Sequence, residues 1–364
     1  MADISKTVQI LFSVENDMSA GLKDINDHIG TIDSSFGGLG GRAKDLAEDI
    51  ALVGIAAIAL ATTFATFAVK EAAEFETAIQ NINTILDETQ GGQLPAIQAG
   101  ILKLTEVLPQ SAQDLAKAFY DIQSGIPLGE KGLILLETAA KAATAGLTSV
   151  QSAVSPFITI LNSYHLGAEK ASTVSDVLFQ VVKDGVITFE QLAGGIGSVA
   201  ALGAGLGQSI EQVGAAIVVL TKNTGQQDES FTRLVALYNQ MAQTDTAEKL
   251  KAFGVEVLDV TGKMRPLDEI IGQMSAKQMT YQDIIKVFPE IRAAMGVNIL
   301  VQDYQSLTYE LNAMKNSQGA TQAAFEKMIR TFDNQIKLLK NAWKSFLIVA
   351  GDPILEALKP IIEE

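Results

Sequence analysis

A long stretch of very low charge constrains the fold of this chain more than any other feature. Between residues 142 and 210 only six of 69 residues are charged, whereas charged residues make up 19% of the whole chain. The stretch is rich in small residues and carries large apolar residues at helical spacing, which predicts packed helices. Such helices must be covered, and three alternatives remain: deep burial, contact with other copies of the chain, or contact with a membrane.

Composition excludes several classes of protein. A net charge of −15 argues against binding to nucleic-acid phosphates, so we expect no sequence-specific nucleic-acid binding. Cysteine is absent, which excludes disulfides and thiolate metal sites. The two histidines are far apart in sequence, which argues against a histidine-based zinc site. We expect His28 to be solvated on a polar helix face and His165 to cap or pack at a helix end.

The first predicted domain covers residues 1–41 and has no secretory signal. Its residues 7–14 alternate between apolar and other side chains, which predicts one short strand. A polar helix is expected to begin at Asp17, followed by a glycine-rich joint at residues 34–41.

Residues 42–90 form the second predicted domain, a long hydrophobic helix. Residues 50–69 carry no charge, and a helix of that length just crosses a hydrocarbon core of ~30 Å. This helix either enters a membrane or is buried in a bundle or between subunits. Residues 191–210 are a second uncharged run of the same length. The large residues of the possible membrane segment are Ile50, Ile55, Ile58, Leu60, Phe64, Phe67 and Val69.

Residues 91–310 are the predicted helical core. Leu147-Thr148 aligns with Ile187-Thr188, and Leu166-Gly167 aligns with Leu206-Gly207, at an offset of 40 residues. This echo predicts two helical hairpins that stack, with chance similarity in Ala/Gly-rich sequence as the alternative.

Two local signals add detail to this core. Ser111 followed by Asp114 predicts the start of a helix, because the pair resembles a capping box. Residues 255–265 are rich in β-branched residues around a Thr-Gly turn, which predicts a small β-hairpin. The expected fold class is therefore mostly α: helical hairpins or a bundle with long terminal helices, a short N-terminal strand and a small hairpin.

The last predicted domain, residues 311–364, combines an amphipathic helix with an apolar tail. Its apolar residues recur at alternating steps of four and three. Such a pattern is typical of a coiled coil between copies and equally of a helix that lies on its own domain. The possible oligomer seam consists of Phe325, Ile329, Phe332, Ile336, Leu339, Trp343 and Phe346.

The sequence context supports no motif of catalysis or cofactor binding. Gly195, Gly197 and Ala200 outline a dinucleotide loop, but no strand precedes them and no acid follows about 20 residues later. The small-residue pairs Gly194/Ser198 and Gly203/Gly207 instead predict close approach between helices. The sequence also lacks H-E-x-x-H and G-x-S-x-G. We therefore expect no catalytic residue, no metal and no cofactor.

Several runs together resemble the core of phage tail tape measure proteins, in the same order and over nearly the whole chain. They are residues 16–25, 115–127, 135–153, 187–225, 252–271 and 332–360. No single run is diagnostic. The resemblance implies a non-enzymatic structural protein that fills the tail-tube lumen of the virion, helps set tail length and leaves ahead of the DNA to aid its passage through the host envelope.

The resemblance also implies partners. They are further copies of the chain, with a trimer favoured, the tail-tube protein, tail assembly chaperones, tail-tip or baseplate hub proteins, and the host membrane on ejection. The protein would be made in the host cytoplasm and could reach the inner membrane or periplasm on infection. Members of this family continue into long helical sequence, so the chain is expected to be a fragment, a truncated form or a short member.

Two other functions are alternatives to the structural role. A membrane-active protein that forms a pore at infection is favoured by residues 50–69 and 191–210. A cell-wall hydrolase is disfavoured because the residues of such an enzyme are missing from the sequence.

Overall fold

The computed structural model describes residues 54–87 and 90–363. The predicted strand at residues 7–14 and the helix expected from Asp17 lie outside these residues. Contacts divide the chain into two units, Met1–Ala68 and Val69–Glu364, and the packing below concerns the second. The described part is mostly α, as predicted, with 16 α-helices and no regular strand.

In chain order the helices are α4 (Gly54–Asn83), α5 (Leu94–Leu104), α6 (Ala112–Gly125), α7 (Gly132–Ala145), α8 (Val150–Ser163), α9 (Ala171–Asp184), α10 (Phe189–Gly205), α11 (Ile210–Thr224), α12 (Gln227–Met241), α13 (Thr244–Ala252), α14 (Leu267–Ala276), α15 (Tyr281–Val287), α16 (Ile291–Gln302), α17 (Tyr304–Lys315), α18 (Ala320–Ile329) and α19 (Phe332–Glu363).

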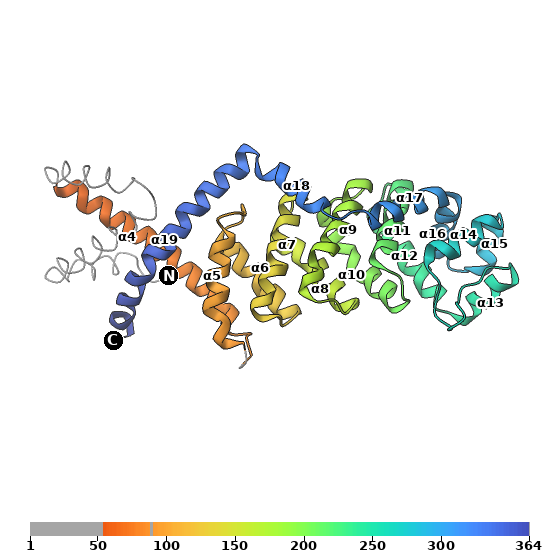
Figure 1. Cartoon of the computed structure of the whole chain (residues 1–364), viewed down its shortest axis with the longest axis horizontal. Coiled ribbons are helices and arrows are strands. Elements are labelled where there is room, and N and C mark those ends of the chain that lie inside the picture. Colours follow the sequence, from red (N-terminus) through yellow and green to blue (C-terminus); the bar gives the residue numbers. More distant parts are fainter. Residues whose placement is uncertain (1–53, 88–89, 364) are drawn as a thin grey trace. The chain divides into compact units, whose positions relative to one another are not determined.

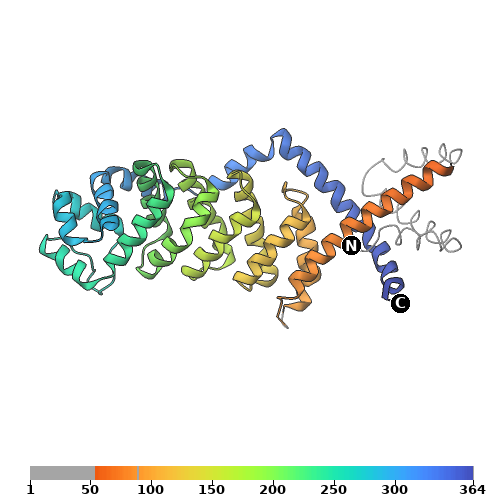
Figure 2. The ribbon, with the colours of Figure 1, turned by 180° about the vertical axis from the view of Figure 1, so that it is seen from behind.

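Helices α6 to α12 pack as two layers (Figure 1). Helices α6, α8, α10 and α12 contact one another in succession, and α7, α9 and α11 form a second row against them. The C-terminal helices then return along the second row: α17 lies on α11 and α9, and α18 lies on α9 and α7 (Figures 1 and 2). The charge-poor stretch is therefore the middle of a packed helical core.

The predicted pair of stacked hairpins is present. Helices α8 and α9 form the first hairpin and α10 and α11 the second, and equivalent helices of the two contact each other. The second hairpin begins at Thr188, whose hydroxyl and backbone form a capping box with Gln191. The first begins at Ser149, one residue after the threonine that the repeat predicted. The capping role of Ser111 is also confirmed, since its Oγ accepts a hydrogen bond from the Asp114 N–H (3.1 Å).

The predicted β-hairpin at residues 255–265 is reduced to a turn. Its pairing is a single bridge between Leu258 and Met264. The backbone ahead of the bridge pairs instead with a side chain, because the Gln273 amide accepts from the Glu256 N–H (2.8 Å) and donates to the Glu256 carbonyl (3.2 Å). A side chain has thus taken the place of a partner strand.

Three helices end on a non-glycine residue with left-handed backbone. Leu147, His165 and Gln278 have φ angles of 55°, 53° and 52°. His165 is thereby placed at the end of α8, the position expected for it. A side chain with a Cβ is strained in this region, by roughly 1–2 kcal/mol.

Replacing Leu147 with glycine is expected to raise the free energy of unfolding by about 0.5–1 kcal/mol, because the strain is removed at some cost in unfolded-chain entropy. Little packing is lost, since Leu147 is 80% exposed. Urea denaturation measures the effect. The matched control is Gly207→Ala, at a φ of 75° with open space around the added methyl group, which should destabilise by a similar amount. A lower free energy of unfolding for Leu147→Gly would contradict the strained left-handed backbone at Leu147.

Candidate functional site

Gly195, Gly197 and Ala200 lie inside α10 and do not form a loop, so the dinucleotide interpretation has no structural basis. A Cβ at Gly195 would collide with the Phe231 ring of α12, and one at Gly203 would lie 2.7 Å from Val213 of α11. The predicted close approach is therefore confirmed at Gly203. It is wrong for Gly194 and Gly207, which have open space. Gly194 faces away from α12 because one residue along a helix turns a side chain by about 100°, and Gly207 lies beyond the end of α10.

A half-buried ion pair joins α11 to α17. Lys222 Nζ lies 2.6 Å from Glu310 Oε1, and the Glu310 side chain is only 2% exposed. Beside it, the Asn223 side chain donates to the Asp303 carboxylate (3.1 Å). These residues are 80 to 88 positions apart in sequence, so no local pattern could have predicted them.

A buried carboxylate ties α9 to the start of α18. Asp176 accepts hydrogen bonds from the backbone N–H groups of Gly319 (2.8 Å) and Thr321 (2.9 Å). Ser175 and Thr321 share a hydroxyl hydrogen bond of 2.9 Å. Asp176 thus caps a helix from a distant segment, a role the sequence did not reveal.

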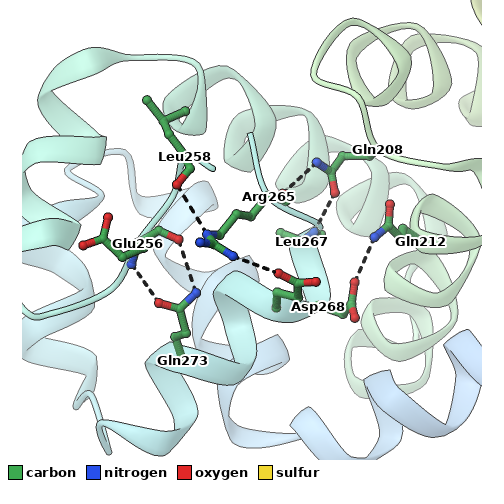
Figure 3. A network of polar contacts seen from close by, with 9 residues as sticks. Gln208, Gln212, Glu256, Leu258, Arg265, Leu267, Asp268 and Gln273 are labelled. Atoms are coloured by element: carbon green, nitrogen blue, oxygen red, sulfur yellow. Dashed lines mark hydrogen bonds and ion pairs between the residues drawn. The ribbon is translucent and has the colours of Figure 1, made fainter. Parts of the chain in front are cut away.

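A network of side-chain amides anchors the turn before α14 (Figure 3). Gln208, which is buried, donates to the Arg265 carbonyl (3.1 Å) and accepts from the Leu267 N–H (2.6 Å). Gln212 donates to Asp268 (2.9 Å). At the tip of the turn, hydrogen bonds from the hydroxyl and backbone of Thr261 and from the backbone of Lys263 hold the pKa of Asp259 below its usual range. The turn is therefore fixed at both base and tip.

Two tyrosines, the buried Tyr238 and the partly buried Tyr164, lie next to the second hairpin. Burial raises the pKa of Tyr238 and of Tyr164 well above the usual value of 10. Neither hydroxyl has a hydrogen-bond partner among the described residues. The folded chain holds these protons up to a higher pH than the unfolded chain does. The free energy of unfolding therefore has its full value below about pH 10 and falls as the pH rises above 10.

Tyr238→Phe is expected to be neutral or stabilising at pH 8, because the unpaired hydroxyl is removed. Above pH 10 the variant should lose less stability than the wild type, by up to about 1.4 kcal/mol for each further pH unit. Urea denaturation at pH 8 and pH 10.5 measures both effects. Equal losses for the two proteins would show that Tyr238 does not resist ionisation.

The predicted seam is divided between two helices. Phe325 and Ile329 lie on α18, where Phe325 is buried in the core. The chain bends at Arg330–Thr331, and the other five seam residues lie on α19. The Asn334 and Gln335 side chains donate to the carbonyls of Met328 and Ile329 across this bend (2.7 and 2.8 Å). The alternating spacing of four and three residues continues across Arg330–Thr331, so the sequence pattern does not reveal the bend.

The possible membrane segment falls partly within the described chain, where residues 54–69 belong to α4. Ile50 lies outside the described residues. Among the described helices, none is both long and apolar enough to cross a membrane singly, and one bent pair, Ala168–Asp184 with Phe189–Gly205, meets the length and composition test. Both helices of that pair bury large parts of their surface in the core.

The described residues hold no group of three or more side chains able to bind a metal ion. A groove of about 570 Å³ lies between α6, α7, α8 and the α18–α19 bend, and its lining includes Asp114, Ser149, Asp333 and Lys337. Its lining contains neither histidine nor cysteine.

Comparison with known proteins places the chain in a family. Residues 98–346 match the phage-related minor tail protein family, and the chain belongs to it. It is distantly homologous to phage tape measure proteins. A probable tape measure protein of Clostridium phage phiCD119 is 25% identical over 310 residues, covering 81% of this chain and 33% of that protein. The tape measure protein of Pneumococcus phage Dp-1 is 22% identical over 308 residues, covering 82% and 27%.

The chain thus spans about a third or less of the relatives' length. No solved structure gives a significant match.

Proposed function

We propose that this chain is the helical core of a tail tape measure protein, which lies in the tail-tube lumen, helps set tail length and leaves with the genome to aid its passage through the host envelope. The match of residues 98–346 to the minor tail protein family carries this proposal. The packed helical hairpins support a structural role. We further propose that the chain self-associates and contacts the tail-tube protein, assembly chaperones and tail-tip proteins.

A stop codon at Lys103 in the phage that encodes this chain tests the proposal. Virions should lack tails of normal length, and the wild-type chain supplied in trans should restore them. Peptides from residues 98–346 should also be found in purified tails by mass spectrometry. Tails of normal length in the mutant, or tails free of the peptides, would refute a structural tail role.

A membrane-active role at infection is the second candidate, favoured by the uncharged first part of α4 (residues 54–69). Dye release from liposomes tests it, with Ala56→Asp and Leu60→Asp as variants that place a charge in this part of the helix. The proposal predicts leakage that both charges abolish. Absence of leakage, or leakage unaffected by either charge, would rule it out.

A further inference from the structure

The bend between α18 and α19 lacks the residues that usually interrupt a helix (Figures 1 and 2). It falls at Arg330–Thr331, where neither glycine nor proline occurs. The apolar spacing also continues through the bend at steps of four, three and four, in the residues Phe325, Ile329, Phe332 and Ile336. In an uninterrupted helix these four side chains share one face. The sequence is therefore compatible with a continuous helix across the bend.

Side-chain amides hold the bend by taking the place of backbone donors. The Asn334 side chain donates to the Met328 carbonyl (2.7 Å), and the Gln335 side chain donates to the Ile329 carbonyl (2.8 Å). In a continuous helix the same two carbonyls accept from the backbone N–H groups four residues further on. Both acceptors thus have a partner in either arrangement, and only the donor changes.

The Thr331 hydroxyl is already bonded as it is inside a continuous helix. It donates to the Met328 carbonyl, three residues earlier, at 2.8 Å. Threonine makes bonds of this kind to the preceding turn of a helix. This contact therefore does not oppose a straight arrangement.

Beyond the bend, α19 is clamped to the core by a few contacts. The buried Asn341 side chain donates to the carbonyls of Leu108 (3.1 Å) and Gln110 (2.7 Å), which lie between α5 and α6. Further along the helix, Leu347 and Ile348 are buried. These contacts exist only while α19 is bent back on the core, so they make the bent form the resting state.

We propose that Arg330–Thr331 is a two-state hinge, at which α19 joins α18 in one straight helix when its clamp opens. That helix covers residues 320–363 and is about 66 Å long. Helix α18 keeps its place in both states, because Asp176 caps its start and Phe325 is buried in the core. The proposal goes beyond the tail role proposed above. Its test uses the purified chain, so either proposal can fail without the other.

Two spin labels measure the state of the hinge by pulsed electron paramagnetic resonance. Ala323→Cys on α18 and Val349→Cys on α19 place them at exposed positions, and the chain has no cysteine of its own. In one straight helix the two positions lie about 39 Å apart along the axis, and in the bent form they lie closer together. We expect the shorter distance to dominate in the chain that carries only the labels.

Removing the contacts of the bent form should shift the hinge towards the straight helix. Asn334→Ala/Gln335→Ala should raise the ratio of long to short distances about twenty-fivefold, about fivefold for each hydrogen bond lost. Adding Asn341→Ala should raise the ratio by a similar factor and make the long distance a resolved component. Circular dichroism should show the fold retained. The matched control Gln322→Ala, whose side chain bonds to Glu326 within α18, should leave the ratio unchanged.

Phe332→Pro separates the two states. Phe332 is the first residue of α19 in the bent form, a position where proline is tolerated, and its side chain is 82% exposed. In a continuous helix the same proline removes a backbone hydrogen bond and collides with the preceding turn. Added to the triple alanine variant, it should therefore abolish the long distance and restore the short one.

Three results would overturn the hinge. The first is a short distance alone in the triple alanine variant, which means a rigid corner. The second is a broad range of distances, which means a disordered α19 and not two states. The third is a long distance that dominates without any loosening substitution, or that persists with Phe332→Pro.

Discussion

Replacing Lys222 with methionine is expected to lower the free energy of unfolding by about 3 kcal/mol, near the lower end of the range for breaking a buried ion pair. The change leaves the Glu310 carboxylate, which is 2% exposed, without its cation. The lower end is expected because Lys222 itself is 43% exposed, so water reaches one side of the pair. Urea denaturation at pH 7 measures the loss.

The double variant Lys222→Met/Glu310→Leu is the control for this prediction. It should recover most of the lost stability, because apolar residues of similar size often replace a buried ion pair at little cost. If Lys222→Met alone costs less than about 1 kcal/mol, Glu310 is not a desolvated charge, and the ion pair does not hold α17 on α11.

Gly195→Ala should destabilise the chain by about 1–3 kcal/mol, since the added methyl group overlaps the Phe231 ring where α10 meets α12. The neighbouring Gly194→Ala provides the matched control. Its methyl group meets open space, and alanine is the better helix former by about 0.5–1 kcal/mol, so this variant should be stabilised.

Adjacent substitutions of the same kind are thus expected to have opposite effects, as measured by urea denaturation. Combining Gly195→Ala with Phe231→Leu should recover part of the loss, because the smaller side chain makes room. Two variants that shift stability in the same direction would contradict the packing of α10 on α12.

The sequence indicated those features of the fold that depend on local chemistry. Ser111 and Thr188 act as N-caps because a hydroxyl satisfies the free N–H groups of the next turn. The offset of 40 residues indicated the stacked hairpins, because both copies place a start signal and a glycine at corresponding positions.

Features that depend on contacts between residues far apart in the chain could not be predicted from the sequence. The return of α17 and α18 along the core relies on Glu310 and Asp176, whose partners lie 88 and 143 or more residues away. The bend at Arg330–Thr331 contains neither glycine nor proline and is held by side-chain bonds from α19. Which glycine of α10 contacts a neighbouring helix depends on the rotation of that helix, and the interval of four shared by Gly194/Ser198 and Gly203/Gly207 specifies neither this rotation nor the end of α10 before Gly207.

Tail length in phage that carry deletions in α19 tests the central claim most directly. Removing 7, 14 or 21 residues between Lys337 and Ala357 deletes whole heptads and so keeps the helix in register. If the chain helps set tail length and α19 runs along the tube, mean tail length in electron micrographs should fall by about 1.5 Å for each residue removed. Tails of unchanged length across the series would contradict the account.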